Sequence, residues 1–410
     1  MNPTLPRFWQ LILPPLLVGA ILRVLWLLIW PRPLIYDEVD YHNLALRLLS
    51  GAGYGVQIFP PGWPLILSYL YRITVPDSMI GLGFNVLVSL VTLVLIAAIA
   101  LRVADHTTAA ISAWIVALLP SYLVANTLLM YEVWAQFLLV LSVWLTLHRT
   151  TTMHDMVALA AITALLALVR PFWLVLPLVL WLAAPPPDQP RHSLPLMLVA
   201  QMLAVLLVLP YIVILSRIYG AFVPLGLNGN VNFWIGNNPQ ATGTFMMPPY
   251  GYWITLSAQA RDATLLYLQE HPMHFFRLLP LKLYHLLGYE AYTGDWVFLQ
   301  AAHQDAFDPH FLATIDWLLN IPYWLLSGSA IVGLALTLAH RHTLMRLWLL
   351  FGFNIATYLI FFGVPRFRWT VQFVMILSAA YALRSLVALW QGHRIPPQTA
   401  RTCPPEQLPL

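Results

Sequence analysis

Apolar runs of about twenty residues recur along the whole chain and constrain its fold more than any other feature. They occupy residues 9–30, 79–101, 107–125, 131–147, 156–184, 193–216, 314–339, 344–362 and 369–389. A helix needs about 20 apolar residues to cross a bilayer. Only 9% of the 410 residues are charged, whereas soluble proteins average about 25%. The sequence therefore predicts an all-α polytopic membrane protein and excludes a soluble enzyme, a disordered chain and a nucleic-acid-binding protein.

The run at 156–184 decides how often the chain crosses the membrane. It has 29 residues and is interrupted only by Arg170 and Pro171. One helix of that length would measure about 44 Å, longer than a ~30 Å hydrocarbon core. Proline disfavours helix at the residue before it, and an arginine inside the bilayer is costly. We expect a tight helical hairpin with Arg170 near one membrane face, and about ten spans in all. A single span would instead invert everything that follows.

The short loops predict the orientation, because cytoplasmic connections carry an excess of arginine and lysine. With a cytoplasmic N-terminus, the inner connections carry Arg102, Arg149, Arg191, Arg341 and Arg346. The short outer connection at 125–131 carries no arginine or lysine, and 12 of the 16 acidic residues lie outside. We expect a multi-pass protein of the plasma (inner) membrane with both termini in the cytoplasm.

Two predicted outer segments, about 31–78 and 217–313, are too long to be simple connectors. Loops of this length in a compact chain are typically functional or disordered, and their many Tyr, Trp and Phe residues argue against disorder. We expect interfacial helices in both segments, within one membrane domain over residues 1–390. The Pro-rich tail, residues 391–410, is expected to be cytoplasmic and disordered.

Carboxylates gather directly after the first apolar run. Asp37, Glu38 and Asp40 follow it and lie within about one helical turn of one another, and on a helix Asp37 and Asp40 share a face opposite Tyr41. Glu132 is a second candidate, because it stands alone beside a predicted span. An acid at a membrane boundary indicates a functional base or ligand. The alternative is that these acids only complement the dipole at helix N-termini.

Basic residues in the later outer segments are candidates for holding an anion. Arg277 and Lys282 lie on a predicted interfacial helix that begins at His271-Pro272, suited to an anionic head group or to simple anchoring on anionic lipid. Arg366 and Arg368 lie in a short outer loop, where the positive-inside rule disfavours them. Their placement indicates a bound anion, and the alternative is snorkelling toward the interface.

Aromatic and amide side chains are candidates for sugar contacts. Residues 228–239 are dense in turn formers and include Trp234 and Asn237. Amides and aromatic rings suit sugar hydroxyls and faces, although a compact loop explains them equally well. Tyr41 and His42, next to the acids of the first loop, are further candidates for substrate contacts.

The combination of outer carboxylates and outer cations fits transfer from a lipid phosphate. In such a reaction a carboxylate deprotonates an acceptor hydroxyl, and cations stabilise the departing phosphate. No Walker, Rossmann or zinc-site motif occurs in the sequence, so the sequence contains no sign of a cytosolic nucleotide site.

Several short motifs, taken in order, resemble those of a known family. The series is Asp37-Glu38-x-x-Tyr41, Gly53-Tyr54, Pro60-Pro61-Gly62-Trp63-Pro64, Leu129-x-x-Glu132, His271-Pro272 with Lys282, and Pro365-Arg366-x-Arg368. It is similar to that of bacterial membrane glycosyltransferases of the protein O-mannosyltransferase / lipid A aminoarabinose transferase type, in the GT-C superfamily. The resemblance covers nearly the whole chain.

The resemblance implies a polyprenyl-phosphate-linked sugar donor, an active site facing the periplasm and an inverting direct displacement. It implies that Asp37 is the catalytic base and that Glu38 and Glu132 are supporting acids. The residues implied for the lipid phosphate are Arg366, Arg368, Lys282 and Arg277. Because the role of a metal varies among GT-C enzymes, the resemblance leaves a divalent metal open.

The predicted function is transfer of a sugar to a hydroxyl of a lipid, glycan or protein acceptor. Two alternatives stay open: a glycan polymerase or ligase acting on lipid-linked glycans, and a transporter or flippase of lipid-linked sugars. A transporter would favour ionisable groups at the midplane and paired repeats. Most charges lie in outer segments and no repeat is visible, which favours the enzyme. Arg23, inside the first span, fits a transporter better.

Overall fold

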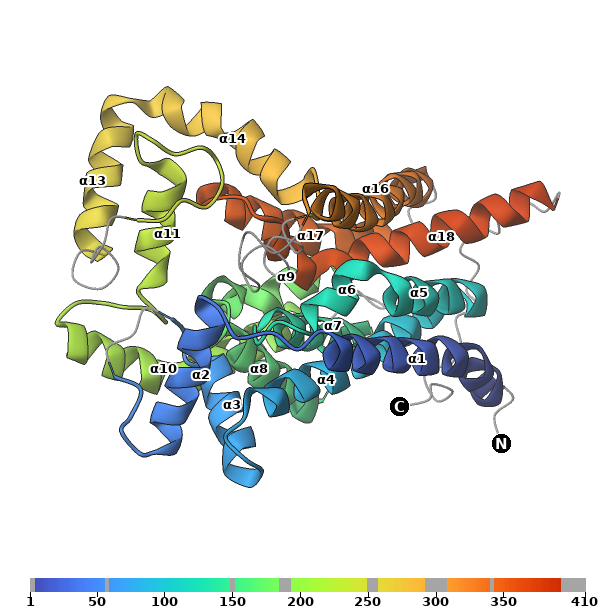
Figure 1. Ribbon diagram of the computed structural model, residues 1–410, viewed down its shortest axis with the longest axis horizontal. Coiled ribbons are helices and arrows are strands. Elements are labelled where there is room, and N and C mark those ends of the chain that lie inside the picture. The colour runs from blue at the N-terminus through green and yellow to red at the C-terminus, as the bar shows by residue number, and fades with distance from the viewer. Residues whose placement is uncertain are drawn as a thin grey trace.

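The computed structural model describes residues 4–55, 59–147, 152–183, 193–248, 257–291, 308–339 and 343–391. Over these ranges the chain forms helices and no strands, as predicted for an all-α protein. Most of the apolar helices run along the long axis of an elongated bundle (Figure 1).

Ten apolar helical segments within the described residues correspond to the ten predicted spans. They are α1 (Thr4–Ile29), α4 (Ser78–Val103), α5 (His106–Leu118), α7 (Glu132–Leu147), α8 (Met153–Ala167), α9 (Leu176–Ala183) with the 3-10 turn η1 (Pro171–Val175), α10 (Leu194–Tyr219), α16 (Pro309–Ala339), α17 (Thr343–Ile360), and α18 (Gln372–Trp390) with the 3-10 turn η3 (Pro365–Val371). Six of them are long and apolar enough to cross a membrane, and four are shorter. A short helix, α6 (Pro120–Ala125), extends the segment that begins with α5.

The long apolar run at 156–184 is divided in two, as predicted. Helix α8 ends at Ala167, and Arg170 has extended backbone angles, φ −134° and ψ 92°. Pro171 then begins η1, which packs back on α8. The backbone at Arg170 has the conformation that proline favours in the residue before it.

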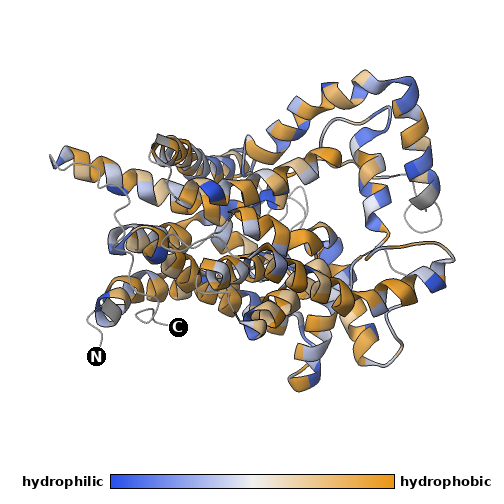
Figure 2. Ribbon diagram, turned by 180° about the vertical axis from the view of Figure 1, so that it is seen from behind, coloured by the Kyte–Doolittle hydropathy of each residue, from blue (hydrophilic) through white to orange (hydrophobic). Residues whose placement is uncertain are grey.

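The outer faces of the bundle are apolar. Helices α1, α10 and α16 leave many large side chains exposed, among them Leu17, Ile21, Leu206, Leu207 and Leu325. The hydrophobic colour covers these helices, whereas hydrophilic residues are more frequent on the helices at one end of the molecule (Figure 2). Apolar area of this extent is stable in lipid rather than in water. The chain is therefore built as a multi-pass membrane protein.

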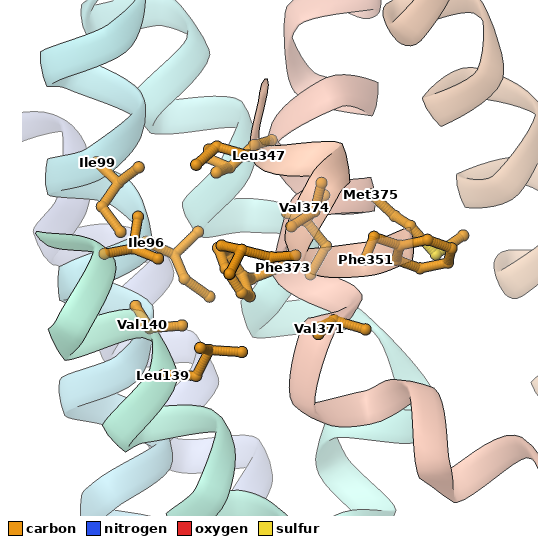
Figure 3. Packing of buried hydrophobic residues seen from close by; sticks show 14 of the residues in the cluster. Ile96, Ile99, Leu139, Val140, Leu347, Phe351, Val371, Phe373, Val374 and Met375 are labelled. Atoms are coloured by element: carbon orange, nitrogen blue, oxygen red, sulfur yellow. The ribbon is translucent and has the colours of Figure 1, made fainter. Parts of the chain in front are cut away.

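The centre of the bundle is a packed apolar core. Ile96 and Ile99 of α4 and Leu139 and Val140 of α7 lie on one side of it (Figure 3). The residues on the other side are Leu347 and Phe351 of α17, Val371 at the end of η3, and Phe373, Val374 and Met375 of α18. This packing fixes η3, the turn that carries two of the predicted cations, against the N-terminal half of the bundle.

The helices of the two long predicted outer segments lie at the same end of the bundle (Figure 1). The first segment forms α2 (Asp37–Leu49) and α3 (Gly62–Ile73), and the second forms α11 (Asn228–Asn237), α13 (Ser257–Glu270) and α14 (Pro272–Leu287). The start of α1 and the end of α18 lie at the opposite end (Figure 1). An even number of spans predicts this arrangement.

The segment 228–239, whose turn formers indicated a loop, is largely helical. It forms the helix α11 as far as Asn237, although asparagine and glycine are poor helix formers. Val231 and Ile235, four residues apart, are fully buried, and this packing outweighs the local preference. The predicted disordered tail lies, after Gln391, outside the described residues.

Candidate active site

An ion pair joins Asp37 and Arg366, two predicted site residues that are far apart in the sequence. Asp37 is the first residue of α2, and its Oδ2 accepts a hydrogen bond from Arg366 Nη2 of η3 at 3.2 Å. The side chain of Asp37 is 27% exposed and that of Arg366 is 14% exposed. The carboxylate is therefore held by a cation and still accessible from outside the protein.

The backbone before Asp37 is unusual. Tyr36 has φ 45° and ψ −125°, a left-handed conformation that residues other than glycine rarely adopt. Such conformations cost on the order of 1–3 kcal/mol and concentrate at functional sites. Tyr36 directly precedes α2, so this conformation lies next to Asp37, the first residue of that helix.

A second acid–arginine pair lies beside the first and is buried. Arg170 Nη2 donates to Glu132 Oε1 at 3.4 Å, and each side chain is only 2% exposed. Glu132 also interacts electrostatically with Arg366 and with Asp37. We call Asp37, Glu132, Arg170 and Arg366 the acid–arginine cluster. Its members come from four separate segments and carry two negative and two positive charges.

Aromatic rings form the walls of the acid–arginine cluster. The Cζ atom of Arg170 lies 4.9 Å from the ring centre of Tyr131, 5.4 Å from that of Tyr358 and 5.6 Å from that of Phe367. The Cζ atom of Arg366 also lies 5.6 Å from the ring centre of Phe367. These distances are within the range of cation–π attraction, so one aromatic ring contacts both guanidinium groups.

Glu38 lies outside the cluster and holds the first loop to the second. Its carboxylate accepts two hydrogen bonds of 2.7 Å from Arg32 and one of 2.6 Å from the backbone N–H of Leu129. Arg32 also donates to the carbonyl of Thr127 at 2.8 Å. Both oxygens of Glu38 are thus engaged, and the side chain is fully buried. The contacts fix the loop that leads into Tyr131 and Glu132.

Arg368, a predicted phosphate ligand, lies in a buried structural contact. It donates to the carbonyls of Leu286 at 2.6 Å and Tyr289 at 3.0 Å, and it forms an ion pair with Glu290. Its side chain also lies over the ring of Tyr323. These contacts attach η3 to the segment after α14 and to α16.

The other two predicted cations are on α14. Lys282 Nζ donates to Asn237 Oδ1 at 2.8 Å and to the carbonyl of Leu359 at 3.1 Å, so it joins α14 to α11 and to the end of α17. Burial lowers the pKa of Lys282 to about 7. Arg277 is exposed. Of the predicted phosphate ligands, the described part of the chain brings Arg366 alone into contact with Asp37.

The predicted substrate contacts are distributed over two places. Tyr41 is buried beside the cluster, with its ring centre 5.8 Å from that of Tyr131. His42 is partly exposed and its Nδ1 lies 2.9 Å from the hydroxyl of Tyr71. Asn237 and the half-buried Trp234 are on α11, away from this contact. Asn237 is buried and uses its amide to bind the carbonyl of Ile360, besides Lys282.

Two residues of the site were not among the predicted ones. The sequence indicates Arg170 only as the break in an apolar run, and it does not single out Tyr131. The signal for Arg170 was present, because an ionisable residue within an apolar span indicates function by default. Tyr131 has no comparable signal in the sequence, since its position next to Arg170 depends on how α7 and α8 pack.

No protein-family model and no curated protein sequence matches the chain. Solved structures of the archaeal oligosaccharyltransferase AglB from Archaeoglobus fulgidus do match in three dimensions. A complex with an inhibitory peptide and a dolichol-phosphate has a TM-score of 0.52 at 13% identity, covering 93% of this chain and 51% of AglB. A complex with Zn and sulfate has a TM-score of 0.54 at 15% identity, covering 92% and 49%. A form tethered to an acceptor peptide has a TM-score of 0.51 at 12% identity, covering 94% and 51%.

The chain therefore has a GT-C-like fold, similar to that of this oligosaccharyltransferase. At this level of identity the likeness shows the fold, and the chain spans about half the length of the oligosaccharyltransferase. The prediction of an all-α, GT-C-like fold is confirmed. The finer resemblance to bacterial O-mannosyltransferases and aminoarabinose transferases stays a prediction.

The described residues contain no group of three or more His, Cys, Asp or Glu side chains placed to hold a metal ion. In the acid–arginine cluster, moreover, each carboxylate already faces a guanidinium group. The positively charged side chains of the acid–arginine cluster are those of Arg170 and Arg366.

Proposed function

We propose that the chain is a membrane glycosyltransferase that moves a sugar, of the hexosyl or pentosyl class, from a polyprenyl-phosphate donor to an acceptor hydroxyl at the extracytoplasmic face. The GT-C fold supports this proposal, as do the dolichol-phosphate and acceptor peptides bound in structures of the same fold. The observation that carries it is the Asp37–Arg366 pair, which places a candidate base next to a candidate phosphate ligand at 3.2 Å.

Asp37 is the acid best suited to be the general base. A base must reach the hydroxyl proton that it removes, and of the three acids that the resemblance implies only Asp37 has an accessible carboxylate. The side chain of Asp37 is 27% exposed, whereas the side chains of Glu38 and Glu132 are 0% and 2% exposed. Glu38 in addition uses both oxygens on Arg32 and Leu129.

The proposed step is a single displacement in which charge and proton balance. Asp37 takes the proton of the acceptor hydroxyl while the acceptor oxygen forms a bond to the anomeric carbon. The bond from that carbon to the phosphate oxygen breaks, its electron pair stays on the phosphate, and the configuration inverts. The donor is a phosphodiester with one negative charge. The leaving group is a phosphomonoester, which carries one negative charge more than the donor. The negative charge lost by Asp37 therefore reappears on the phosphate.

The ion pair gives this transfer of charge a physical route. While Asp37 is ionised, Arg366 is shared between the carboxylate and the donor phosphate. Once Asp37 is protonated, the guanidinium group is attracted mainly by the phosphate, whose charge has just increased. Stabilisation thus grows in the transition state, which is the condition for catalysis rather than mere binding.

Mass spectrometry of a strain that lacks the chain tests the proposal. We expect a polyprenyl-phosphate sugar to accumulate and one envelope glycan, lipid or protein to lose that sugar. Complementation with the wild-type gene restores the product, whereas Asp37→Asn does not. Unchanged lipid and glycan profiles in the deletion strain would contradict the proposed function.

A further inference from the structure

Arg170 has unused hydrogen-bonding capacity in a buried place. A guanidinium group has five N–H donors, and the hydrogen bond of Arg170 with a side chain is the 3.4 Å contact to Glu132. Its Nε is buried and has no hydrogen-bond partner among the described residues, and the same is true of Glu132 Oε2. A buried charged group with unsatisfied donors is costly, which indicates that a ligand completes the site.

The position of Arg170 identifies which ligand that is. Arg170 and Arg366 lie at equal distances, 5.6 Å, from the ring centre of Phe367, and both interact with Glu132. The phenol of Tyr131 interacts electrostatically with both arginines as well. Two guanidinium groups beside one ring and one carboxylate suit an anion with several oxygens, such as a phosphate.

We infer that Arg170 is a second cationic ligand of the donor phosphate, held in orientation by Glu132. The inference rests on the proposed function, because it takes the phosphate next to Arg366 as given. Arg170 keeps its contact with Glu132 through Nη2 and offers its other N–H groups to the phosphate oxygens. Glu132 is then a positioning residue, and its burial explains how an acid fits beside an anion site without serving as the base.

A second arginine would stabilise the negative charge that the phosphate gains in the proposed step. The phosphate gains one negative charge as the sugar leaves, and Arg366 is still partly engaged by Asp37 until that carboxylate is protonated. Arg170 is paired with an acid that takes no proton in the step, so its charge acts on the phosphate throughout. The released polyprenyl phosphate, with the larger charge, should depend on Arg170 more strongly than the sugar-bearing donor does.

Equilibrium binding to the purified full-length protein in detergent tests the inference. The probe is a fluorescent polyprenyl phosphate, displaced by unlabelled polyprenyl phosphate or by the uncharged polyprenol. Wild-type protein should bind the phosphate and not the polyprenol. Arg170→Gln should weaken binding about tenfold or more, the effect of losing a charge-assisted hydrogen bond. Glu132→Gln keeps an amide oxygen that can accept the hydrogen bond from Arg170 and removes the negative charge, so it should strengthen binding.

The control variant is Arg384→Gln. Arg384 is also an arginine paired with a carboxylate, at 2.7 Å from Asp105, but it lies near the far end of α18. This variant should bind as the wild type does. Arg170→Lys keeps the positive charge and loses the planar guanidinium group, so it tests the inference even if Arg170→Gln misfolds. Its affinity for polyprenyl phosphate should lie between those of wild type and Arg170→Gln.

The possible failures are distinguishable. If wild-type protein binds polyprenol as well as polyprenyl phosphate, the proposed function is wrong. If it prefers the phosphate, and Arg366→Ala abolishes that preference while Arg170→Gln and Arg170→Lys bind as the wild type does, Arg170 is not a ligand. Equal weakening by Arg170→Gln and Glu132→Gln would likewise overturn the inference, because a merely structural pair predicts the same sign for both variants.

Discussion

Asp37 and Arg366 form an ion pair of 3.2 Å although 329 residues separate them in the sequence. Asp37 begins α2, the first helix after the first span, and Arg366 lies in η3, the turn before the last span. The pair therefore links α2 to η3 and holds a candidate base against a cation. Because both side chains remain partly exposed, a substrate can reach the pair from outside, and the ion pair can exchange partners.

Loss of the Glu38 carboxylate should destabilise the fold. Glu38→Gln removes the partner of Arg32, whose side chain is only 5% exposed. Breaking one side of a buried ion pair costs about 3 kcal/mol or more. Thermal unfolding in detergent should show a clearly lower midpoint for Glu38→Gln than for Asp37→Asn, the adjacent and more exposed acid. Equal midpoints for Glu38→Gln and wild-type protein would show that Glu38 does not hold the two loops together.

A methyl group at Gly62 should disturb the turn that carries Arg170. The N–H of Gly62 donates to the carbonyl of Leu168 at 2.8 Å, and a Cβ at Gly62 would lie 2.7 Å from that oxygen. The backbone shifts that would remove such a clash destabilise a protein by about 1–3 kcal/mol. We expect Gly62→Ala to lower both the unfolding midpoint and the rate of sugar transfer. Gly83→Ala is the control, because nothing lies within 4 Å of its added Cβ; similar losses in both variants would contradict this reading.

The buried amine of Lys282 should make stability depend on pH. Burial lowers its pKa from 10.5 to about 7, so between these values the unfolded chain binds one proton more than the folded one. The free energy of unfolding therefore rises with pH between pH 7 and 10.5. Below pH 7, Lys282 is protonated in both states and no longer makes the free energy of unfolding depend on pH. The unfolding midpoint of wild-type protein should rise between pH 7 and 9 relative to that of Lys282→Met. A difference that stays constant with pH would count against this assignment.

The fold was largely predictable because each apolar run encodes one helix. The break at Arg170, the helix after Tyr36 and the basic helix after His271 all followed from local signals: a proline, an acidic amphipathic start and a Pro at the first turn. The site was predictable only in part. Asp37 and Arg366 were found because each stands out against its local background, one as part of a carboxylate cluster and one as a charge that orientation rules disfavour.

The contacts between helices were not predictable in the same way. Arg366 and Arg368 are two residues apart and look equivalent in sequence, yet one contacts Asp37 and the other is buried against Glu290. Lys282 and Asn237 were assigned to different ligands, and in the structure they bind each other. Such pairings depend on how helices rotate and cross, and the apolar pattern of a membrane helix, which is apolar on all sides, leaves that rotation unspecified.

The rate of sugar transfer by Asp37→Asn, compared with Asp40→Asn, tests the central claim most directly. Asp40 lies one turn further along α2 and is exposed, and its pKa is raised by partial desolvation and by the neighbouring Asp37. Initial rates are measured with purified protein, polyprenyl-phosphate sugar and acceptor. Asp37→Asn should lose about a hundredfold or more, the contribution of a general base, while Asp40→Asn stays close to wild type. Wild-type rates in Asp37→Asn would contradict the assignment of Asp37 as the base.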